Sequence, residues 1–307
     1  MDLQSNQKFV DEIRSRMAPE HILLNEPMKD HTTFRIGGPA DCLILPASME
    51  DVAFVFQCLK RHDIPFVILG NGSNVLVLDK GIRGAVIKFN SPISDIRKKK
   101  NTLTAGAGAL LRDVSEFAAE NSLSGMEFAC GIPGSIGGAV FMNAGAYDGE
   151  MKNIVSAVRA ISPKGEIVQF AANELDFGYR HSIFQENGCA ICEVDLTLAP
   201  GNAEEIKEKI AGFTERRESK QPLEMPSAGS TFKRPEGHYA GTLIEQTGLK
   251  GFTVGGAQVS DKHAGFVVNA GDATAKDVLE LIRQVQDRVF EKHHVKLFPE
   301  VRILGEA

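Results

Sequence analysis

The sequence predicts a mixed α+β fold of more than one domain, not a doubly wound parallel sheet. The chain has 307 residues, which is long for a single hydrophobic core. A strand-rich middle, 154–198, separates two regions in which helical and strand patterns are mixed. Gly106-Ala107-Gly108 lacks the third glycine of a Rossmann fingerprint, and the absence of any Gly-Lys pair excludes a P-loop.

The first region reads as short elements joined by turn residues. Residues 6–17 have the spacing of an amphipathic helix, and Ser48 is expected to cap the next helix, because Glu50 and Asp51 follow in its first turn. Strands are expected at 41–45, 66–69, 75–78, 85–88 and 102–105, and a further helix at 110–121. The basic run Arg97–Lys100 is interpreted as a solvated turn.

The rest of the chain begins with the strand-rich block. Strands are expected at 154–161, 167–170 and 189–198, followed by a charged helix at 203–217. Pro222 and Pro226 indicate a domain junction. Beyond it the patterns predict helices at 241–246 and 273–293, and strands near 252, at 266–269 and at 295–303.

Composition excludes several classes of protein. The net charge of −6 argues against a general nucleic-acid binder. Five cysteines cannot all pair, which favours a reducing cytoplasm, and no signal peptide, membrane span or metal site is expected. Cys189 and Cys192 have redox-motif spacing, but two buried thiols on a strand are the favoured interpretation.

Two glycine-rich segments carry the strongest functional signal. Residues 131–147 contain five glycines and three alanines, and residues 70–74 follow the apolar run 66–69. Backbone without side chains lets N–H groups reach phosphate oxygens, so two such loops fit one dinucleotide. An ordinary tight turn is the alternative for either loop taken alone.

Six ordered motifs resemble the UDP-N-acetylenolpyruvoylglucosamine reductase family, in its shorter subclass. They are H-T-T-F-R-I-G-G (31–38), L-G-N-G-S-N-V (69–75), G-I-P-G-S-I-G-G (131–138), G-Y-R-H-S-I-F (178–184), A-G-S-T-F-K (228–233) and F-P-E-V-R (298–302). The resemblance implies an α+β, vanillyl-alcohol-oxidase-like (PCMH-type) FAD-binding fold. It further implies FAD-binding subdomains at 1–100, completed by 298–307, and at 101–218, with a substrate-binding domain at 219–297.

The resemblance also implies the site residues. Cofactor contacts are expected from Gly70, Asn71, Gly72, Ser73, Asn74, Val75, Ile132, Pro133, Gly134, Ser135, Gly137, Gly138, Asn143 and Val194. The expected catalytic residues are Ser230 as proton donor, Arg180 against the substrate carboxylate, and Glu300 as a hydrogen-bond donor. Substrate contacts are expected from Tyr179, Arg217, Lys220, Lys233, Gln258 and His263.

Each of these residues also has a plain structural interpretation. Ser230 could be a turn serine, Arg180 an ion-pair partner and Glu300 a partner of a nearby cation. Arg217 and Lys220 could form a solvated helix end, and His263 could fill a hydrogen-bonded corner.

Two features depart from the family pattern. Position 234 is arginine where many relatives carry asparagine, and the stretch from Arg180 to Ser230 is too short for the tyrosine loop of the longer subclass.

The expected reaction is reduction of UDP-N-acetylglucosamine enolpyruvate by NADPH through non-covalent FAD, in a cytoplasmic bacterial enzyme of peptidoglycan synthesis. Negative charge develops next to the substrate carboxylate, so the protein must supply a cation and a proton donor. One site would take NADPH and then the nucleotide-sugar in turn, and a monomer is expected. The alternatives are an FAD-dependent sugar or alcohol oxidase of the same fold, and a non-catalytic flavin or nucleotide-sugar binding protein.

Overall fold

The computed structural model describes residues 3–307, which form two compact units. Unit 1 contains residues up to 24, 42–71 and 84–215, and unit 2 contains 25–41, 72–83 and 216–307. Each unit has its own buried apolar core. Residues 25–41 and 72–83 therefore belong to unit 2, although they lie inside the first predicted segment, 1–100. The three-domain division stays a prediction.

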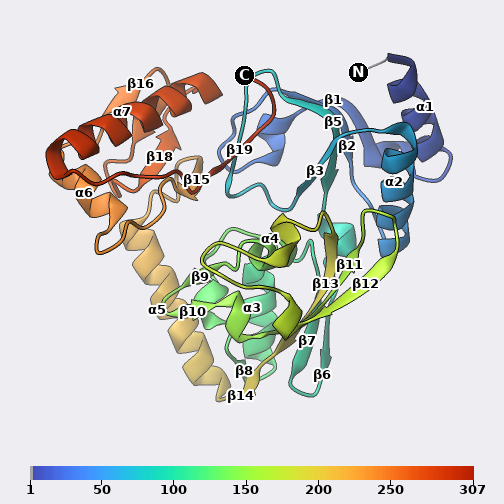
Figure 1. The fold of residues 1–307 in the computed structure, drawn as a ribbon. Helices are drawn as coiled ribbons and strands as arrows, with labels where there is room; N and C mark the ends of the chain where they lie inside the picture. Colours follow the sequence, from blue (N-terminus) through green and yellow to red (C-terminus); the bar gives the residue numbers. More distant parts are fainter. Residues whose placement is uncertain (1–2) are drawn as a thin grey trace. The chain divides into compact units, whose positions relative to one another are not determined.

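Unit 1 is built around a five-stranded antiparallel sheet with the strand order β12-β11-β13-β7-β6 (Figure 1). The strands are β12 (Ile167–Ala171), β11 (Val155–Ile161), β13 (Ala190–Thr197), β7 (Thr102–Gly106) and β6 (Ile96–Lys99). The helices of this unit are α1 (Leu3–Arg14), α2 (Met49–His62), α3 (Leu111–Glu120), α4 (Ile136–Phe141) and the greater part of α5 (Ala203–Lys220).

The sequence predicted the start of α2 correctly, but not the edge strand β6. The hydroxyl of Ser48 accepts a hydrogen bond of 3.1 Å from the Asp51 amide, which confirms the predicted cap of α2. The predicted turn at Arg97–Lys100 is wrong, because residues 96–99 form the edge strand β6. Lysine and arginine are poor strand formers, but on an exposed edge they deter pairing with another chain.

Unit 2 holds a four-stranded antiparallel sheet with the order β15-β18-β17-β16. These strands are β15 (Ser227–Ser230), β18 (Phe266–Asn269), β17 (Ala257–Val259) and β16 (Thr253–Val254). The long helix α7 (Ala275–His293) packs on β16, β17 and α6 (Ala240–Gln246) through apolar residues spaced three or four apart (Figure 1). A separate parallel pair joins β4 (Val75–Val77) to β19 (Arg302–Leu304).

Short elements complete the fold. A further sheet has the order β1-β2-β5-β3, with strands β1 (Ile22–Pro27), β2 (Pro39–Ile44), β5 (Ile82–Lys88) and β3 (Phe66–Leu69). Two-residue strands pair as β8 (Leu123–Ser124) with β14 (Ala199–Pro200), and β9 (Gly145–Ala146) with β10 (Gly149–Glu150). Seven 3-10 helices, η1–η7, lie at 19–21, 28–31, 91–93, 127–129, 151–153, 172–174 and 183–185 of the described chain.

The strand predicted at 295–303 is shorter in the structure. Only residues 302–304 form β19, and the preceding residues make an isolated bridge between Phe232 and Pro299. Pro299 has no amide to donate to a ladder, which accounts for the irregular stretch.

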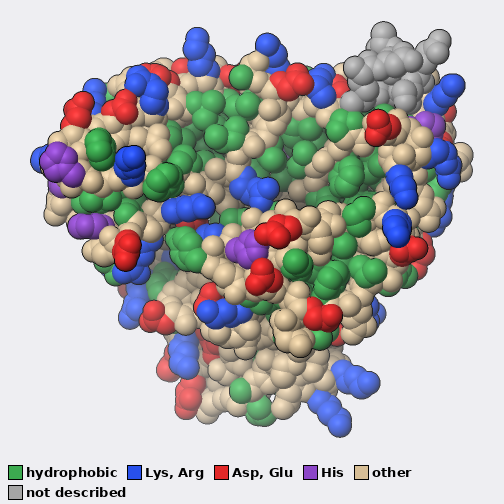
Figure 2. Space-filling model, in the orientation of Figure 1, with side chains coloured by type: hydrophobic (Ala, Val, Ile, Leu, Met, Phe, Trp, Pro, Cys, Tyr) green, Lys and Arg blue, Asp and Glu red, His purple; other side chains and the backbone are tan. Residues whose placement is uncertain are grey.

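The surface carries charges of both signs. On the face seen in Figure 2, Lys and Arg side chains are interspersed with Asp and Glu side chains. Within residues 3–307, no helix combines the length and the apolar character required to cross a bilayer.

Candidate functional site

The two glycine-rich loops meet in unit 1. Asn71 Nδ2 donates a hydrogen bond of 2.7 Å to the carbonyl oxygen of Pro133, which lies 62 residues further along the chain. A Cβ atom on Gly70 would lie 2.4 Å from Ser135 Oγ, so only glycine permits this approach. The sequence therefore brings its two stretches of bare backbone into contact.

The backbone amides of the loops divide into two groups. The Gly137 amide donates to the Ala107 carbonyl at 2.9 Å, and the Gly138 amide donates to Ser135 Oγ at 3.4 Å, so these two amides are used within the fold. Within residues 3–307, the amides of 70–74 and of Gly134 and Ser135 have no protein acceptor. A diphosphate needs donors of this kind, and the loops therefore fit a dinucleotide through fewer amides than the sequence suggested.

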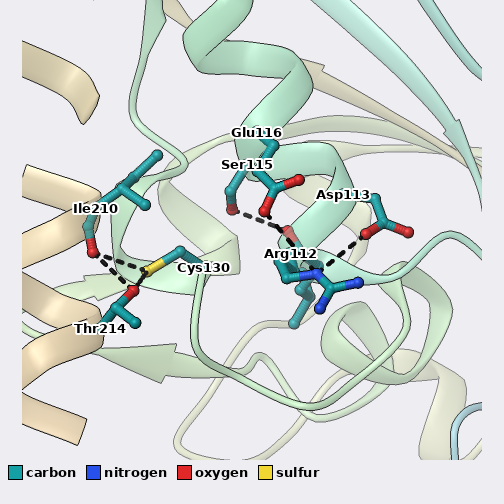
Figure 3. A network of polar contacts seen from close by, with 8 residues as sticks. Arg112, Asp113, Ser115, Glu116, Cys130, Ile210 and Thr214 are labelled. Carbon is teal, nitrogen blue, oxygen red and sulfur yellow. Dashed lines mark hydrogen bonds and ion pairs between the residues drawn. The ribbon is translucent and has the colours of Figure 1, made fainter. Parts of the chain in front are cut away.

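The second glycine-rich segment, together with Cys130 just before it, contacts the helices α5 and α3. Cys130 Sγ lies 3.8 Å from the Ile210 carbonyl oxygen and 3.9 Å from Thr214 Oγ1, both on α5 (Figure 3). The amide of Leu111, at the start of α3, donates to the Gly134 carbonyl at 3.0 Å. Ser115 of the same helix donates to the Leu111 carbonyl at 2.8 Å (Figure 3). The loop therefore rests on two helices that do not belong to it.

Tyr179 and Arg180 are the two central residues of a tight turn in unit 1. Gly178 and His181 exchange backbone hydrogen bonds of 3.1 and 3.3 Å across it, and Arg180 has a left-handed φ of +55°. The guanidinium carbon of Arg180 lies 5.4 Å from the centre of the exposed Tyr179 ring. The turn presents both residues as a cation beside an aromatic ring.

Two predicted cofactor residues lie away from any free surface. Val194 is 0 % exposed, and its backbone pairs with Val158 on one side and Ala105 on the other. Asn143 is 1 % exposed, and its side chain is hydrogen-bonded to protein groups. The contacts of Val194 and Asn143 with the cofactor stay predictions.

Ser230 ends β15 at a bulge in unit 2. Ser227 faces Val268 and Ser230 faces Phe266, so Ala228 and Gly229 together oppose Val267. Gly229 has a φ of +74°, which only glycine adopts without strain. In a regular strand, Ser230 would face the same side as the buried Ala228, two residues earlier. The bulge breaks this alternation, so Ser230 is exposed, while the next residue, Thr231, is again buried.

The segment 298–304 connects Ser230 with the glycine-rich loop inside unit 2. The Glu300 amide donates to the Thr231 carbonyl at 2.8 Å, and the Lys233 amide donates to the Phe298 carbonyl at 2.8 Å. At its other end, the Arg302 amide donates to the Asn74 carbonyl at 3.0 Å. Glu300 is half-buried between these two attachments.

The first sequence motif supports the same loop. Gly72 has a φ of +70°, its carbonyl accepts a hydrogen bond of 3.2 Å from the Thr33 amide, and a Cβ there would lie 2.3 Å from the His31 carbonyl oxygen. Thr33 Oγ1 donates to the Ser227 carbonyl at 2.7 Å. The loop residues Gly72, Ser73, Asn74 and Val75 are thus joined to the Ser230 strand through residues 31–38 as well.

His263 occupies a hydrogen-bonded corner before β18. Its Nδ1 accepts a hydrogen bond of 3.0 Å from the Gly265 amide, and its ring meets Phe266 edge-on at 5.1 Å. Burial lowers the pKa of His263 below its usual value. Gln258, on β17, donates to the Gly251 carbonyl at 3.4 Å.

The predicted cations for the diphosphate lie at the end of α5. Lys220 is exposed, while both Arg217 Nε and Arg217 Nη2 donate to Gln221 Oε1, at 3.0 and 2.7 Å. Lys262 Nζ donates to the Glu218 carbonyl at 2.6 Å, which ties this helix end to the His263 loop. Lys233 is exposed, and the Arg234 guanidinium lies 4.2 Å from the centre of the Tyr239 ring.

Sequence reasoning missed three supporting residues. Thr231 Oγ1 accepts from the Val267 amide at 2.9 Å and closes the bulge beside Ser230. Gln185 Nε2 donates to the Arg180 carbonyl at 2.9 Å. Lys262 joins α5 to the His263 loop. Only their positions next to predicted motifs could have indicated them.

Known proteins match both halves of the chain. Residues 40–171 match the model of an FAD binding domain, and residues 221–304 match that of the UDP-N-acetylenolpyruvoylglucosamine reductase C-terminal domain. The UDP-N-acetylenolpyruvoylglucosamine reductase of Clostridium perfringens (strain SM101 / Type A) is 54 % identical over 286 residues, which are 93 % of this chain and 94 % of the relative.

Solved structures of the same family and of the same fold also resemble this chain. The crystal structure of UDP-N-acetylenolpyruvylglucosamine reductase from Thermus caldophilus is similar with a TM-score of 0.79 and 39 % identity, over 92 % of this chain and 98 % of that one. A grass pollen allergen with glucose dehydrogenase activity, 13 % identical with a TM-score of 0.50 over 62 % of this chain and 44 % of that one, shares the fold alone. The predicted α+β fold of the vanillyl-alcohol-oxidase-like FAD-binding class is confirmed.

Proposed function

The chain belongs to the UDP-N-acetylenolpyruvoylglucosamine reductase family, and from this premise we propose that it reduces UDP-N-acetylglucosamine enolpyruvate to UDP-N-acetylmuramate, with NADPH as reductant. The observation that carries the proposal is the segment 298–304. Its amides bond to the Ser230 strand at Thr231 and to the glycine-rich loop at Asn74, within one unit. A proton donor and a cofactor-binding loop are thereby joined by a few residues of backbone.

FAD would be held without a covalent bond by the amides of 70–74 and of Gly134 and Ser135. These amides have no acceptor within residues 3–307, and the loops touch through Gly70 and Ser135. When bound, FAD would supply the hydride that the reduction needs, from its N5 atom. The N–H groups of these loops are already in place, so the loops need not rearrange when the diphosphate binds.

Arg180 would bind the carboxylate of the enolpyruvyl group. Its planar guanidinium cation offers two parallel N–H donors, which suits a planar carboxylate. Negative charge develops on the carbon beside that carboxylate during reduction, so a fixed cation stabilises the transition state more than the ground state. Tyr179, beside Arg180 in the turn, would pack against the same group.

Ser230 would donate the proton to this carbon. A serine hydroxyl is a weak acid, but a developing carbanion is a much stronger base, so the transfer runs downhill once the charge has formed. The bulge at Gly229 supports this role, because it leaves Ser230 exposed although Ala228 and Thr231 are buried. Glu300 would donate a hydrogen bond to the same charge.

The remaining substrate residues would bind the nucleotide-sugar. Arg217 and Lys220 would supply cations for its diphosphate, and Lys233, Gln258 and His263 would supply further polar contacts to the substrate. The product is a peptidoglycan precursor. Five buried cysteines support the predicted reducing cytoplasm, and a monomer stays the expected state.

The test separates the two half-reactions. In Ser230→Ala, NADPH should reduce the bound flavin at a near-normal rate, while reoxidation by the enolpyruvyl sugar should slow by about 10²–10⁴-fold, the range for a lost proton donor. Ser227→Ala, on the same strand, is the control and should keep both rates. Stopped-flow absorbance of the flavin band measures each rate. Equal loss in both half-reactions would remove Ser230 from the proposed role.

A further inference from the structure

We propose that Asn143 is a positioning residue for Arg180 and not a cofactor ligand. This inference rests on the proposed function, because it takes Arg180 as the residue that binds the substrate carboxylate. It departs from the family resemblance, which implied a cofactor contact for Asn143. All residues involved lie in unit 1.

The hydrogen bonds of Asn143 account for its whole side chain. Nδ2 donates to the Gly178 carbonyl and to Glu150 Oε2, each at 2.9 Å, and Oδ1 accepts from the Lys152 amide at 2.9 Å. An asparagine amide has two N–H donors, so both are in use. With 1 % of the residue exposed, its side chain has neither a donor nor a surface to offer a ligand.

The accepting carbonyl is the one that opens the Arg180 turn. Gly178 and His181 close the turn, and Arg180 between them has a left-handed φ of +55°. A non-glycine residue in that region costs roughly 1–2 kcal/mol unless its surroundings hold it there. The bond from Asn143 fixes one side of the turn, and the bond from Gln185 Nε2 to the Arg180 carbonyl, 2.9 Å, fixes the other.

Both attachments lead back to the end of α4. Gln185 Nε2 also donates to the Phe141 carbonyl at 3.0 Å, and the fully buried Ser182 donates to the same carbonyl at 2.8 Å. Asn143 follows two residues after Phe141, the last residue of α4. The helix α4 starts directly after Ser135. This one short helix therefore sets the distance between residues 131–135 and the Arg180 turn.

This arrangement matters because the carboxylate must be held at a fixed place relative to the cofactor. A displacement of about 1 Å in a reacting group can cost about 10²-fold in rate. Glu150 strengthens the anchor, since a hydrogen bond from Nδ2 to a charged carboxylate is stronger than one to a neutral oxygen. Lys152 Nζ, 2.5 Å from Glu150 Oε1, balances its charge.

The decisive variant is Asn143→Gly. Glycine accepts the φ of +42° found at this position, so the change removes three hydrogen bonds without adding backbone strain. We expect the FAD content and the rate of flavin reduction by NADPH to stay within twofold of wild type. Reoxidation by the enolpyruvyl sugar should slow by about 10–10²-fold. Asn121→Gly, which removes one side-chain bond at the end of α3, is the matched control and should change neither rate.

A double-mutant cycle with Arg180→Ala separates positioning from general damage. If Asn143 acts through Arg180, adding Asn143→Gly to Arg180→Ala should slow reoxidation by less than a further twofold. Multiplying losses in the double variant would overturn the proposal, as would loss of FAD or slow reduction by NADPH in Asn143→Gly.

Hydrogen exchange gives a readout that does not depend on activity. The His181 amide, bonded to Gly178 at 3.3 Å, should exchange at least tenfold faster in Asn143→Gly and not in Asn121→Gly. Unchanged exchange would overturn the positioning role. If wild-type protein binds FAD but fails to reduce the enolpyruvyl sugar, the proposed function fails, while exchange still decides whether Asn143 holds the turn. Gln185→Leu, which frees the other side of the turn, should give the same pattern if Asn143→Gly cannot be purified.

Discussion

The backbone amide of Glu300 donates a hydrogen bond of 2.8 Å to the carbonyl oxygen of Thr231, the residue that follows Ser230. This bond depends on the main chain alone, so the side chain at position 300 can be changed without breaking it. Two predicted catalytic residues, 70 positions apart in sequence (300 minus 230), are thereby kept in a fixed backbone relationship. Their chemical contributions can be tested separately from their packing.

Substitution of Glu300 should distinguish hydrogen-bond donation from a purely structural role. Glu300→Ala removes the donor and should slow flavin reoxidation by the enolpyruvyl sugar by about 10²–10³-fold, as for other donors to a developing negative charge. Glu300→Gln replaces the carboxyl O–H donor by an amide N–H donor and should retain more activity than the alanine variant. Both should unfold in urea within about 0.5 kcal/mol of wild type. Equal rates in the two variants would argue against donation.

The bulge at Gly229 should matter more for activity than for stability. A Cβ on Gly229 would have no neighbour within 4 Å, so Gly229→Ala meets no clash and only the strain of a φ of +74°. The free energy of unfolding should fall by about 1–2 kcal/mol. Relaxation of the backbone would turn Ser230, so reoxidation should slow by about tenfold or more while reduction by NADPH is retained. Activity that declines only in proportion to the folded fraction would contradict this reading.

Contact between the two loops should be required for FAD binding. In Gly70→Ala the new methyl group would lie 2.4 Å from Ser135 Oγ, so the loops must separate. The purified variant should carry little flavin, measured as the ratio of absorbance near 450 nm to that near 280 nm. Ser135→Gly removes the clashing hydroxyl, and the double variant should recover flavin relative to Gly70→Ala. Failure of this rescue would show that the loops are not coupled through this pair.

Burial of His263 should give stability a measurable pH dependence. Burial lowers the pKa of His263 in the folded chain, whereas the unfolded chain has an ordinary histidine pKa of about 6.5. Above that pH, His263 is neutral in both the folded and the unfolded chain, so it does not make the free energy of unfolding depend on pH. As the pH falls below about 6.5, the unfolded state binds the proton first, and the free energy of unfolding decreases.

His263→Asn should therefore flatten the decline of stability between about pH 6.5 and 5. Urea unfolding at a series of pH values measures it. His238→Asn changes an exposed histidine and should leave the decline as in wild type. Parallel curves for wild type and His263→Asn would contradict the buried neutral state.

The cysteines should be unreactive in the folded protein. Burial raises the pKa of Cys192 to about 12 and also raises the pKa of Cys189, and the thiolate is the reactive form. At pH 8 a thiol reagent should modify neither residue quickly in native protein, and should modify all five cysteines after unfolding in urea. Fast native reaction at Cys189 and Cys192 would instead favour the redox interpretation of their spacing.

Local sequence was sufficient where a short segment carries its own signal. Ser48 with its acidic first turn predicted the start of α2, and regular apolar spacing predicted α7. The six motifs were sufficient for the family and the fold, which the comparisons confirm. The roles of the individual site residues stay predictions.

Contacts between distant residues determined the strand boundaries and the burial that the sequence did not reveal. Residues 97–99 are charged, and the segment 96–99 forms a strand only because β7 offers its edge. Residues 295–301 look apolar, yet Pro299 and the attachment to Thr231 keep most of them out of a ladder. Val194 lies on a strand paired on both sides and is 0 % exposed, a burial that its sequence position did not reveal, and its cofactor contact stays a prediction.

The sequence by itself determined the family, the FAD-binding class of fold and the segments that bear glycines, cations and the serine, because these depend on residue identity and spacing along the chain. Tertiary structure alone decided that Asn71 meets Pro133, that Glu300 is tied to Thr231, and that Asn143 donates one hydrogen bond to Gly178 at the start of the Arg180 turn. The reason is physical: a hydrogen bond between distant residues depends on where folding brings the donor and acceptor, and neither residue type records its partner.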